Sequence, residues 1–345
     1  MIAPSSAVFL LLVLFASVGN VLKDSRSTAV MVVASKLPSQ PKNPVVGVFT
    51  NPLVECPPPP AAPHGQPPFT QCMEAYAANW LKAQAVRVVP FPWNLTDSEQ
   101  LSLLHSVDGV YIPGGGISSS SIFNLYFARL SSVVEKAIQL NQNGIPVALW
   151  ATCFGFELMM AAVAGSLNCI ADGYRGMMPA MLPLQFTSDQ PRSRVLGAAT
   201  TPPRILHALQ FNNSTLNWHT KGISTSAFKT FPKLQQFFSA VATSQEPVSP
   251  FRPFIALVEA RNASFNIFGS QFHPDRSPFE FSNDLIGHSP SDLAVSHYFS
   301  EFVARLAACN RSNASFPGGA DKVNRRSVDT LIRTYDGWGI QWLWM

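Results

Sequence analysis

The stretch Ala151-Thr152-Cys153-Phe154-Gly155 decides the fold, because it joins two segments of different kinds. The apolar residues 146–150 before it indicate a buried strand, and residues 156–162 after it indicate the start of a helix. A cysteine on such a tight turn is a nucleophile elbow with sulfur in place of serine oxygen. We expect its thiol to be exposed, with the following helix N-terminus favouring the thiolate. A free cysteine is also commonly a small buried hydrophobe, so a partner histidine must decide between the two interpretations.

Short apolar segments alternate with helical ones on both sides of this turn. Further strands are expected at 45–50, 86–90, 109–112, 182–187, 254–259 and 265–269. Helices are expected at 72–83, 96–105, 121–140, 232–241 and 291–308, the second opened by a capping box from Thr96 to Glu99. In the last helix we expect these side chains to face inward: Leu293, Val295, Phe299, Phe302, Val303 and Leu306. The alternation predicts an α/β fold, a three-layer sandwich with a parallel central sheet and helices on both faces, whose site lies at the carboxyl ends of the strands.

The N-terminus indicates a secretory route. Residues 7–18 are apolar, too short for a comfortable membrane span, and followed by small residues, which is typical of a signal peptide; an uncleaved anchor is the alternative. We divide the chain into a signal peptide (1–19), a linker (20–44), an α/β domain (45–309) and a C-terminal tail (310–345). Glycosylation motifs at six asparagines agree with this route: Asn94, Asn212, Asn213, Asn262, Asn310 and Asn313. After signal cleavage we expect no membrane span, and a location outside the cell or in a lysosome or vacuole.

Composition excludes several classes of partner. The net charge is only +4 and the basic residues are scattered, so no nucleic-acid surface is expected. No His/Cys/Asp cluster has the spacing of metal ligands, and nothing indicates an organic cofactor. The five cysteines leave at least one thiol free. If that thiol belongs to Cys153, the other four could form up to two disulfides in three connectivities: Cys56, Cys72, Cys169 and Cys309.

Two other segments could complete a site around the cysteine. His273 follows the strand at 265–269 and can face Cys153 from another strand end, with Asp275 spaced to hold the imidazole. An ordinary strand-to-loop turn, with Asp275 capping a helix, is the alternative. The segment Pro113-Gly114-Gly115-Gly116 can bring a bare backbone N–H close to a ligand, or is merely a flexible turn. With the N–H of Phe154 it could form an oxyanion hole.

Taken in order, three motifs resemble a known family: Pro113-Gly-Gly-Gly116, Thr152-Cys-Phe-Gly-Phe-Glu157 and Gly269-Ser-Gln-Phe-His-Pro-Asp275. They are similar to the class I glutamine amidotransferase fold and, within it, to the gamma-glutamyl hydrolases that act on folate poly-γ-glutamates. The likeness runs from Val45 to Leu306, with a fainter echo at 330–339. It also includes the following segments: Val45–Thr50, Val86–Pro90, Asn217-Trp218-His219, Pro278-Phe-Glu-Phe281 and Ile286-Gly-His-Ser-Pro290.

The resemblance implies a cysteine-type hydrolase of poly-γ-glutamyl folates that works through a thioester. Cys153 would attack the γ-amide carbonyl, His273 would transfer the proton, and Asp275 would orient His273. By analogy with the family, the chain could form a homodimer. A glutaminase domain that supplies ammonia, or a non-catalytic secreted relative that binds a small acidic ligand, are the alternatives.

The resemblance also assigns backbone and binding positions. The N–H groups of Phe154 and Gly115 would hold the oxyanion. Substrate binding falls to Gly114, Gly116 and His219, and proton handling is the alternative role for His219.

Two residues depart from the family pattern. Ala151 stands where the family has Gly, which adds a Cβ at a tight turn. Asp275 stands where the family has Glu and is shorter by one bond, about 1.5 Å. Either the backbone shifts inward around Asp275, or its pair with His273 is looser.

Overall fold

The computed structural model describes residues 43–56, 70–310, 332–335 and 340–343. The expected signal peptide, nearly all of the linker, most of the tail and the motif at Asn313 lie outside these residues. Among the residues described, no helix has both the length and the apolar character needed to cross a membrane. The division into segments stays a prediction.

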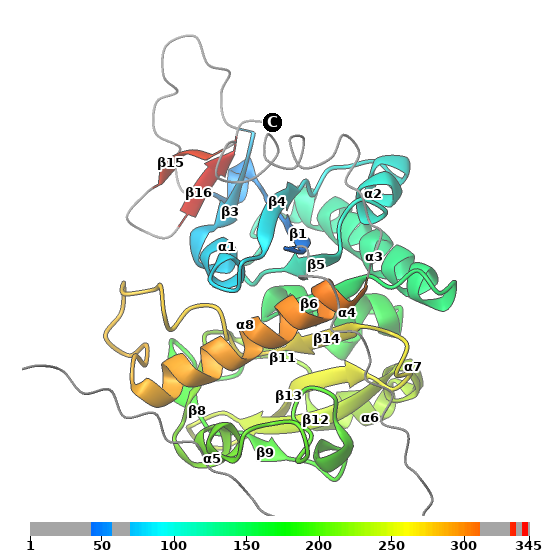
Figure 1. Cartoon of the computed structure of the whole chain (residues 1–345). Helices are drawn as coiled ribbons and strands as arrows, with labels where there is room; N and C mark the ends of the chain where they lie inside the picture. Colours follow the sequence, from blue (N-terminus) through cyan, green and yellow to red (C-terminus); the bar gives the residue numbers. More distant parts are fainter. Residues whose placement is uncertain (1–42, 57–69, 311–331, 336–339, 344–345) are drawn as a thin grey trace, which may run out of the picture. The chain divides into compact units, whose positions relative to one another are not determined.

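The main sheet has eight strands in the order β4-β1-β5-β6-β14-β13-β12-β9 (Figure 1). Their bounds are β4 Arg87–Phe91, β1 Val45–Phe49, β5 Gly109–Ile112, β6 Ala148–Thr152, β14 Ile267–Ser270, β13 Pro253–Ala260, β12 Phe238–Gln245 and β9 Gln185–Phe186. The first five are parallel, and each of the last three is antiparallel to its neighbour. Since β1, β5, β6 and β14 are neighbours, their carboxyl ends meet at one edge of the sheet.

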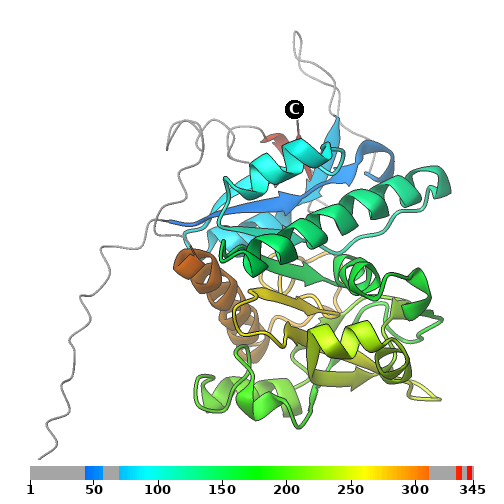
Figure 2. The ribbon, with the colours of Figure 1, turned by 90° about the vertical axis from the view of Figure 1, so that its right-hand side faces the viewer.

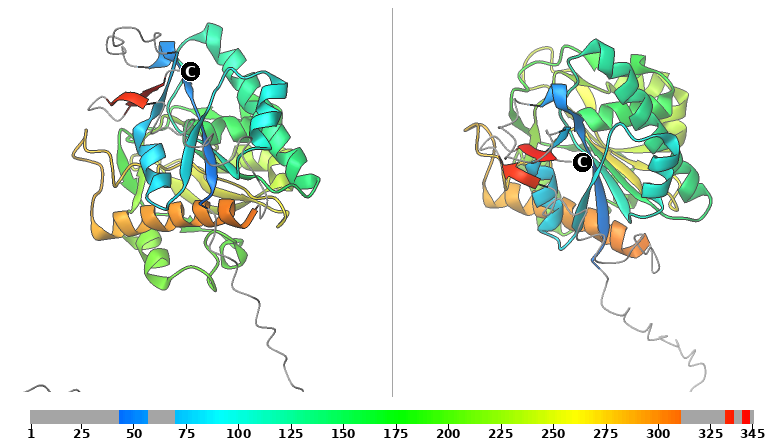
Figure 3. Two further views of the ribbon diagram at one scale, coloured as in Figure 1. Left: turned by 45° about the horizontal axis from the view of Figure 1, so that its top comes forward. Right: turned by 90° about the horizontal axis from the view of Figure 1, so that it is seen from above.

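Helices cover both faces of this sheet, as predicted (Figures 2 and 3). Successive strand side chains point to opposite faces. Thus Val46 and Val48 of β1 join one core cluster, and Val45 and Phe49 join the other. The first cluster takes in α1 (Ala75–Lys82), α5 (Pro203–Phe211) and α8 (Pro290–Asn310). The second takes in α2 (Asp97–Leu104), α3 (Ser120–Gln142), α4 (Phe154–Ala164), α6 (Thr225–Thr230) and α7 (Pro232–Phe237).

Smaller elements complete the described chain. β10 (Thr215–Asn217) pairs with β8 (Ala180–Leu182), and β11 (Lys221–Gly222) pairs with β7 (Ala171–Asp172). A further sheet has the order β15-β16-β3-β2, from Ile332–Tyr335, Ile340–Leu343, Gln71–Glu74 and Asn51–Pro52. Short 3-10 helices are η1 (Leu53–Glu55), η2 (Leu167–Cys169) and η3 (Gln190–Arg192).

Most expected elements are confirmed, including the capping box at Thr96 and Glu99, but four details are wrong. The strand expected at 182–187 is interrupted: β8 ends at Leu182 and β9 covers only Gln185–Phe186, because the two pieces pair in different sheets. The helix expected from residue 72 starts at Ala75, because residues 71–74 pair with β2 and β16 as β3. The helix expected at 232–241 ends at Phe237, and Phe238 begins β12 alongside β13. In these stretches apolar residues fill a core from a strand as well as from a helix, so pattern alone cannot separate them. In α8, Leu293 is exposed rather than inward.

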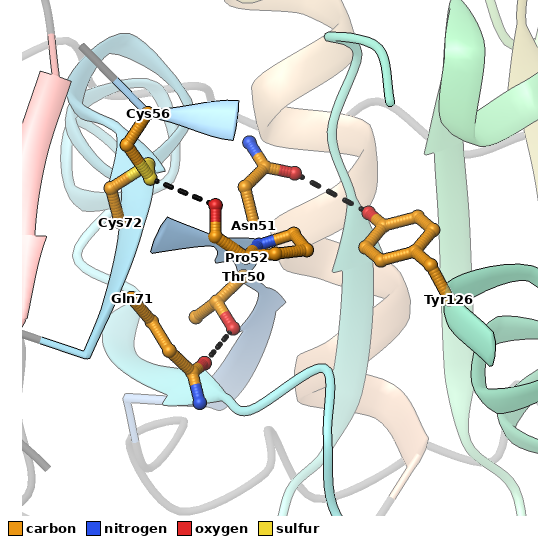
Figure 4. The surroundings of a disulfide bond; sticks show 7 residues. All are labelled: Thr50, Asn51, Pro52, Cys56, Gln71, Cys72 and Tyr126. Carbon is orange, nitrogen blue, oxygen red and sulfur yellow. Dashed lines mark hydrogen bonds between the residues drawn. A yellow bond between two sulfur atoms is a disulfide. The ribbon is translucent and has the colours of Figure 1, made fainter. Parts of the chain in front are cut away.

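One disulfide, Cys56–Cys72, ties β3 to the segment after β2 (Figure 4). The thiols of Cys153, Cys169 and Cys309 are free. Beside the disulfide, the Tyr126 hydroxyl donates to Asn51 Oδ1 at 3.4 Å. These contacts fix β2 and β3 at the carboxyl end of β1, which is where the candidate site lies.

We predict that Cys72→Ser lowers the free energy of unfolding by about 3 kcal/mol, because the cross-link spans 16 residues and restricts the unfolded chain. Urea unfolding under non-reducing conditions measures this loss. Cys309→Ser, which alters an exposed free thiol, is the control and should leave the midpoint unchanged. Equal midpoints for both variants would contradict the prediction.

Candidate active site

The backbone at Cys153 forms the tight turn between β6 and α4. Its φ is +51° and its ψ is −114°, a conformation that side-chain-bearing residues rarely adopt. The Cys153 N–H donates to the Ser270 carbonyl oxygen of β14 at 2.8 Å, which holds the turn. A Cβ at Gly155 would lie 2.5 Å from the Pro113 carbonyl oxygen, so only glycine lets α4 begin this close to the neighbouring loop.

Three predicted segments meet at this turn. A Cβ built on Gly114 would lie 2.5 Å from His273 Cε1 and 3.2 Å from Cys153 Cβ. Gly114 is therefore packed against both side chains, and the structure brings the three residues together. Gly115, with φ +117°, and Gly116 are exposed, so this part of the loop faces solvent next to the buried cluster.

Asp275 lies behind His273. Of the two expected arrangements, an inward shift of the backbone or a looser pair, the structure has the looser pair. His273 Nδ1 is 3.4 Å from Asp275 Oδ1, and neither atom has a hydrogen-bond partner within the described part of the chain. The other carboxylate oxygen, Oδ2, accepts from the Tyr111 hydroxyl at 2.8 Å. Both members of the pair are buried. The backbone has not moved inward far enough to give Asp275 and His273 an aligned hydrogen bond.

The expectation that Cys153 carries an exposed thiolate is wrong. Cys153 is only 4% exposed, and its Sγ donates to the Trp218 carbonyl oxygen at 3.8 Å. Burial, together with the nearby Glu157 carboxylate, raises the pKa of Cys153, while Arg276 and the Phe154 N–H lower it without reversing the effect. The desolvation of a buried thiolate therefore outweighs the helix N-terminus. The resting site holds a thiol.

The electrostatics of His273 and Asp275 follow from the same burial. Burial and the Arg276 charge lower the pKa of His273, although Asp275 opposes them. Burial disfavours ionised Asp275, but His273, Arg276 and the Tyr111 hydroxyl keep its pKa below the usual range. The resting arrangement is a thiol, a neutral imidazole and a carboxylate, which suits proton transfer to the imidazole as a bond forms at sulfur.

His219 lies near this cluster, on the segment that follows β10. Its Nδ1–H donates to the Lys221 carbonyl oxygen at 2.6 Å, and its ring packs edge-on against Tyr174 and Phe254. Burial lowers the pKa of His219 to about 4. The imidazole is therefore neutral over most of the physiological range.

Arg276 and Glu74 are site residues that sequence reasoning missed. The Arg276 guanidinium lies over the rings of Tyr76 and Trp218, and its Nη2 is 3.2 Å from Glu74 Oε1. Arg276 Nε and Glu74 Oε2 have no hydrogen-bond partner among the residues described. Arg276 follows Asp275 directly, which was an available signal. Glu74 falls in the stretch expected to be helical, so the sequence does not indicate that it faces the site.

Glu157 lies one helical turn after Cys153 and is 3% exposed. Its Oε1 accepts from Gln271 Nε2 at 2.9 Å, and burial raises the pKa of Glu157 to about 7. Its charge thus changes near neutrality, right beside the thiol.

Other predicted positions lie away from this cluster. Four glycosylation asparagines, Asn94, Asn212, Asn213 and Asn262, are exposed, and the side chain of Asn310 is not among those described. Within the described ranges, no group of three His, Cys, Asp or Glu side chains is placed to hold a metal ion.

No family model matches the chain. Curated relatives do: a gamma-glutamyl hydrolase of Mus musculus is 28% identical over 233 residues, which cover 67% of this chain and 69% of the relative. Gamma-glutamyl hydrolase B of Dictyostelium discoideum is 26% identical over 260 residues, which cover 75% of this chain and 70% of that relative. The chain is a homologue of gamma-glutamyl hydrolases. This confirms the resemblance seen in the sequence, and the relatives' names are those of enzymes.

Among solved structures, a glutamine amidotransferase from Thermotoga maritima matches with a TM-score of 0.42 and 10% identity. The match covers 77% of this chain and 99% of that one.

We predict that Gly114→Ala lowers the free energy of unfolding by about 1–3 kcal/mol, because the new methyl group would overlap the His273 ring. Urea unfolding measures the change. Gly116→Ala is the matched control in the same loop, since a Cβ there meets nothing within 4 Å. An equal loss in both variants would show that Gly114 is not packed against His273.

We also predict that Glu157→Gln changes how stability depends on pH. A carboxyl whose pKa rises on folding stabilises the fold below its unfolded pKa, and this contribution is lost as pH rises through the folded pKa. For Glu157 that window runs from 4.5 to about 7. At pH 8 the variant should be more stable than the wild type by up to about 3 kcal/mol, and near pH 4.5 the gap should close.

Urea unfolding across this pH range measures the gap. Glu135→Gln, an exposed position on α3, is the control and should follow the wild-type curve. A constant gap between Glu157→Gln and the wild type would contradict the assignment.

Proposed function

We propose that the protein is a cysteine-type hydrolase that cleaves γ-glutamyl bonds of folate poly-γ-glutamates. One observation carries the proposal: Gly114 packs against both Cys153 and His273, with Asp275 behind the imidazole, in a homologue of gamma-glutamyl hydrolases. A thiol on a strand-to-helix turn, a histidine and a carboxylate are the groups that acyl transfer through sulfur requires.

The proposed reaction has two steps. Cys153 Sγ attacks the γ-amide carbonyl carbon and passes its proton to His273. The C–N bond then breaks as His273 protonates the departing amine, which leaves a thioester on Cys153. In the second step His273 takes a proton from water, the hydroxide attacks the thioester, and the thiol re-forms as the shortened γ-glutamyl acid leaves.

We propose two backbone N–H groups, those of Phe154 and Gly115, as donors to the oxyanion. The Phe154 N–H lies beside the Cys153 sulfur at the start of α4, which supports its role as the first donor. The exposed Gly115 is proposed as the second donor, and the exposed loop at Gly115 and Gly116 is proposed as the side from which substrate enters. We assign Gly114 and His219 to substrate binding at the buried side.

The charge beside the thiol suits an acidic compartment. Below about pH 7 Glu157 becomes neutral, which removes a negative charge that opposes the thiolate. Exposure of the asparagines in four glycosylation motifs also supports a secretory route. We therefore propose an extracellular, lysosomal or vacuolar location.

We predict that the wild-type protein hydrolyses pteroyl-poly-γ-glutamate at acidic pH, and that Cys153→Ala reduces the rate by a thousandfold or more, on the order seen for lost nucleophiles. Chromatography of the shortened folates measures the rate. Cys309→Ser, which alters an exposed thiol, is the control and should retain full activity.

Two outcomes would reject the folate proposal. One is no cleavage by folded wild-type protein with a free Cys153 thiol, from acidic to mildly alkaline pH. The other is equal activity in Cys153→Ala. Release of ammonia from free glutamine would point instead to a glutaminase.

A further inference from the structure

A buried chain of hydrogen bonds links the strand that carries the nucleophile to the orienting carboxylate. Trp150 Nε1 donates to Thr152 Oγ1 at 3.1 Å, and Thr152 Oγ1 is 3.0 Å from the Tyr111 hydroxyl. That hydroxyl lies 2.8 Å from Asp275 Oδ2. All four residues are at most 1% exposed. Water therefore cannot replace a missing member of this chain without entering the core.

The direction of the hydrogen bonds is fixed by chemistry. Tyr111 has one hydroxyl hydrogen, and an ionised carboxylate can only accept, so this hydrogen goes to Asp275. The Thr152 hydroxyl must then donate to the Tyr111 oxygen, and Thr152 accepts in turn from the Trp150 indole. Each donor hydrogen in the chain thus has one assigned acceptor. The Tyr111 hydroxyl is thus held in place before it meets the carboxylate.

Asp275 needs such an anchor because its contact with His273 is poorly aligned. The distance from Oδ1 to Nδ1 is 3.4 Å, and these two atoms have no hydrogen-bond partner among the described residues. The hydrogen bond from Tyr111 is the short one on this carboxylate, and it sets the direction in which Oδ1 points. The ring of Tyr111 is itself fixed by packing against Trp80, with centroids 5.5 Å apart.

We propose that Tyr111 is a positioning residue, whose hydroxyl holds the short Asp275 carboxylate against His273 in the hydrolytic site. This inference rests on the proposed function. The inference extends the proposed function by naming a residue on β5 that acts through Asp275 without touching the substrate. The same hydroxyl lies only 2.8 Å from Asp275 Oδ2, so we expect a carboxylate that reaches one bond further to meet it. Tyr111 and Asp275 should therefore be coupled, and a glutamate should fit at position 275 only when the hydroxyl is absent.

The test is a double-mutant cycle on the full chain, with Tyr111→Phe, Asp275→Glu and the double variant. We expect Tyr111→Phe to lower kcat about ten- to a hundredfold with KM nearly unchanged, because the imidazole is displaced while the binding surface stays intact. Asp275→Glu should lower kcat similarly, because its extra length meets the hydroxyl. The double variant should have a higher kcat than either single variant. Two results would overturn the proposal. One is a fold loss of kcat in the double variant equal to the product of the fold losses in the two single variants. The other is a wild-type kcat in folded Tyr111→Phe.

Tyr298→Phe is the matched control for a merely structural role. Tyr298 lies on α8, and its hydroxyl is also in the interior, 2.5 Å from the Val195 carbonyl oxygen. It should lose stability in urea like Tyr111→Phe but keep the wild-type kcat. A fall in kcat as large as that of Tyr111→Phe would count against positioning.

A second readout needs no substrate. The rate at which iodoacetamide alkylates Cys153, followed by mass spectrometry, depends on a correctly placed imidazole to accept the thiol proton. The alkylation rates of the wild type, the two single variants and the double variant should rank in the same order as their kcat values. If the wild type fails to hydrolyse pteroyl-poly-γ-glutamate but this order holds, the folate proposal falls and the role of Tyr111 stands. If hydrolysis is seen but Tyr111→Phe matches the wild type in both assays, only the Tyr111 inference falls.

Discussion

The positive φ angle at Cys153 is the constraint on which the site depends. A residue with a side chain stays at φ +51° only where its surroundings enforce that conformation. Here the enforcement comes from pairing of β6 with β14 on one side and from the absence of a side chain at Gly155 on the other. Together they place the sulfur at the junction of three strand ends. The parallel order of β5, β6 and β14 then brings the glycine loop and His273 to the same point without any long connection.

The second constraint is the removal of water from charged groups. Asp275, Glu74 and Arg276 are largely buried, and lone charges there would be strongly destabilising. Arg276 relieves this by pairing with Glu74 and lying over two aromatic rings. For the Cys153 sulfur, burial and Glu157 outweigh the compensation from Arg276 and the Phe154 N–H, so the thiol stays protonated at rest. This favours a mechanism in which the thiol proton moves to His273 during attack rather than beforehand.

Much of this arrangement was predictable because the signals were local. The apolar segments gave β1, β4, β5 and β6, Thr96 and Glu99 gave the start of α2, and the turn at Cys153 gave the elbow. The expectations that failed concern residues whose structure depends on contacts with distant parts of the sequence. Residues 71–74 form a strand because β2 and β16 pair with them, and β16 lies more than 260 residues later in the chain. Thiol burial arises from the segment at Trp218, and the Arg276–Glu74 pair joins residues 202 positions apart.

Asp275 shows how a departure in one motif is understood only through another element. From the sequence, a carboxylate shortened by one bond implied an inward backbone or a weak pair. The structure has the loose contact with His273, but the carboxylate is not free to rotate, because the Tyr111 hydroxyl on β5 holds its other oxygen. A tyrosine in a buried strand would ordinarily count as core, and its ring does pack as core. Its hydroxyl, however, must satisfy a hydrogen bond in the interior, and of the two acceptors within its reach the charged carboxylate is the stronger. The length lost at position 275 and the hydroxyl present at position 111 are therefore parts of one arrangement, and neither motif alone reveals it.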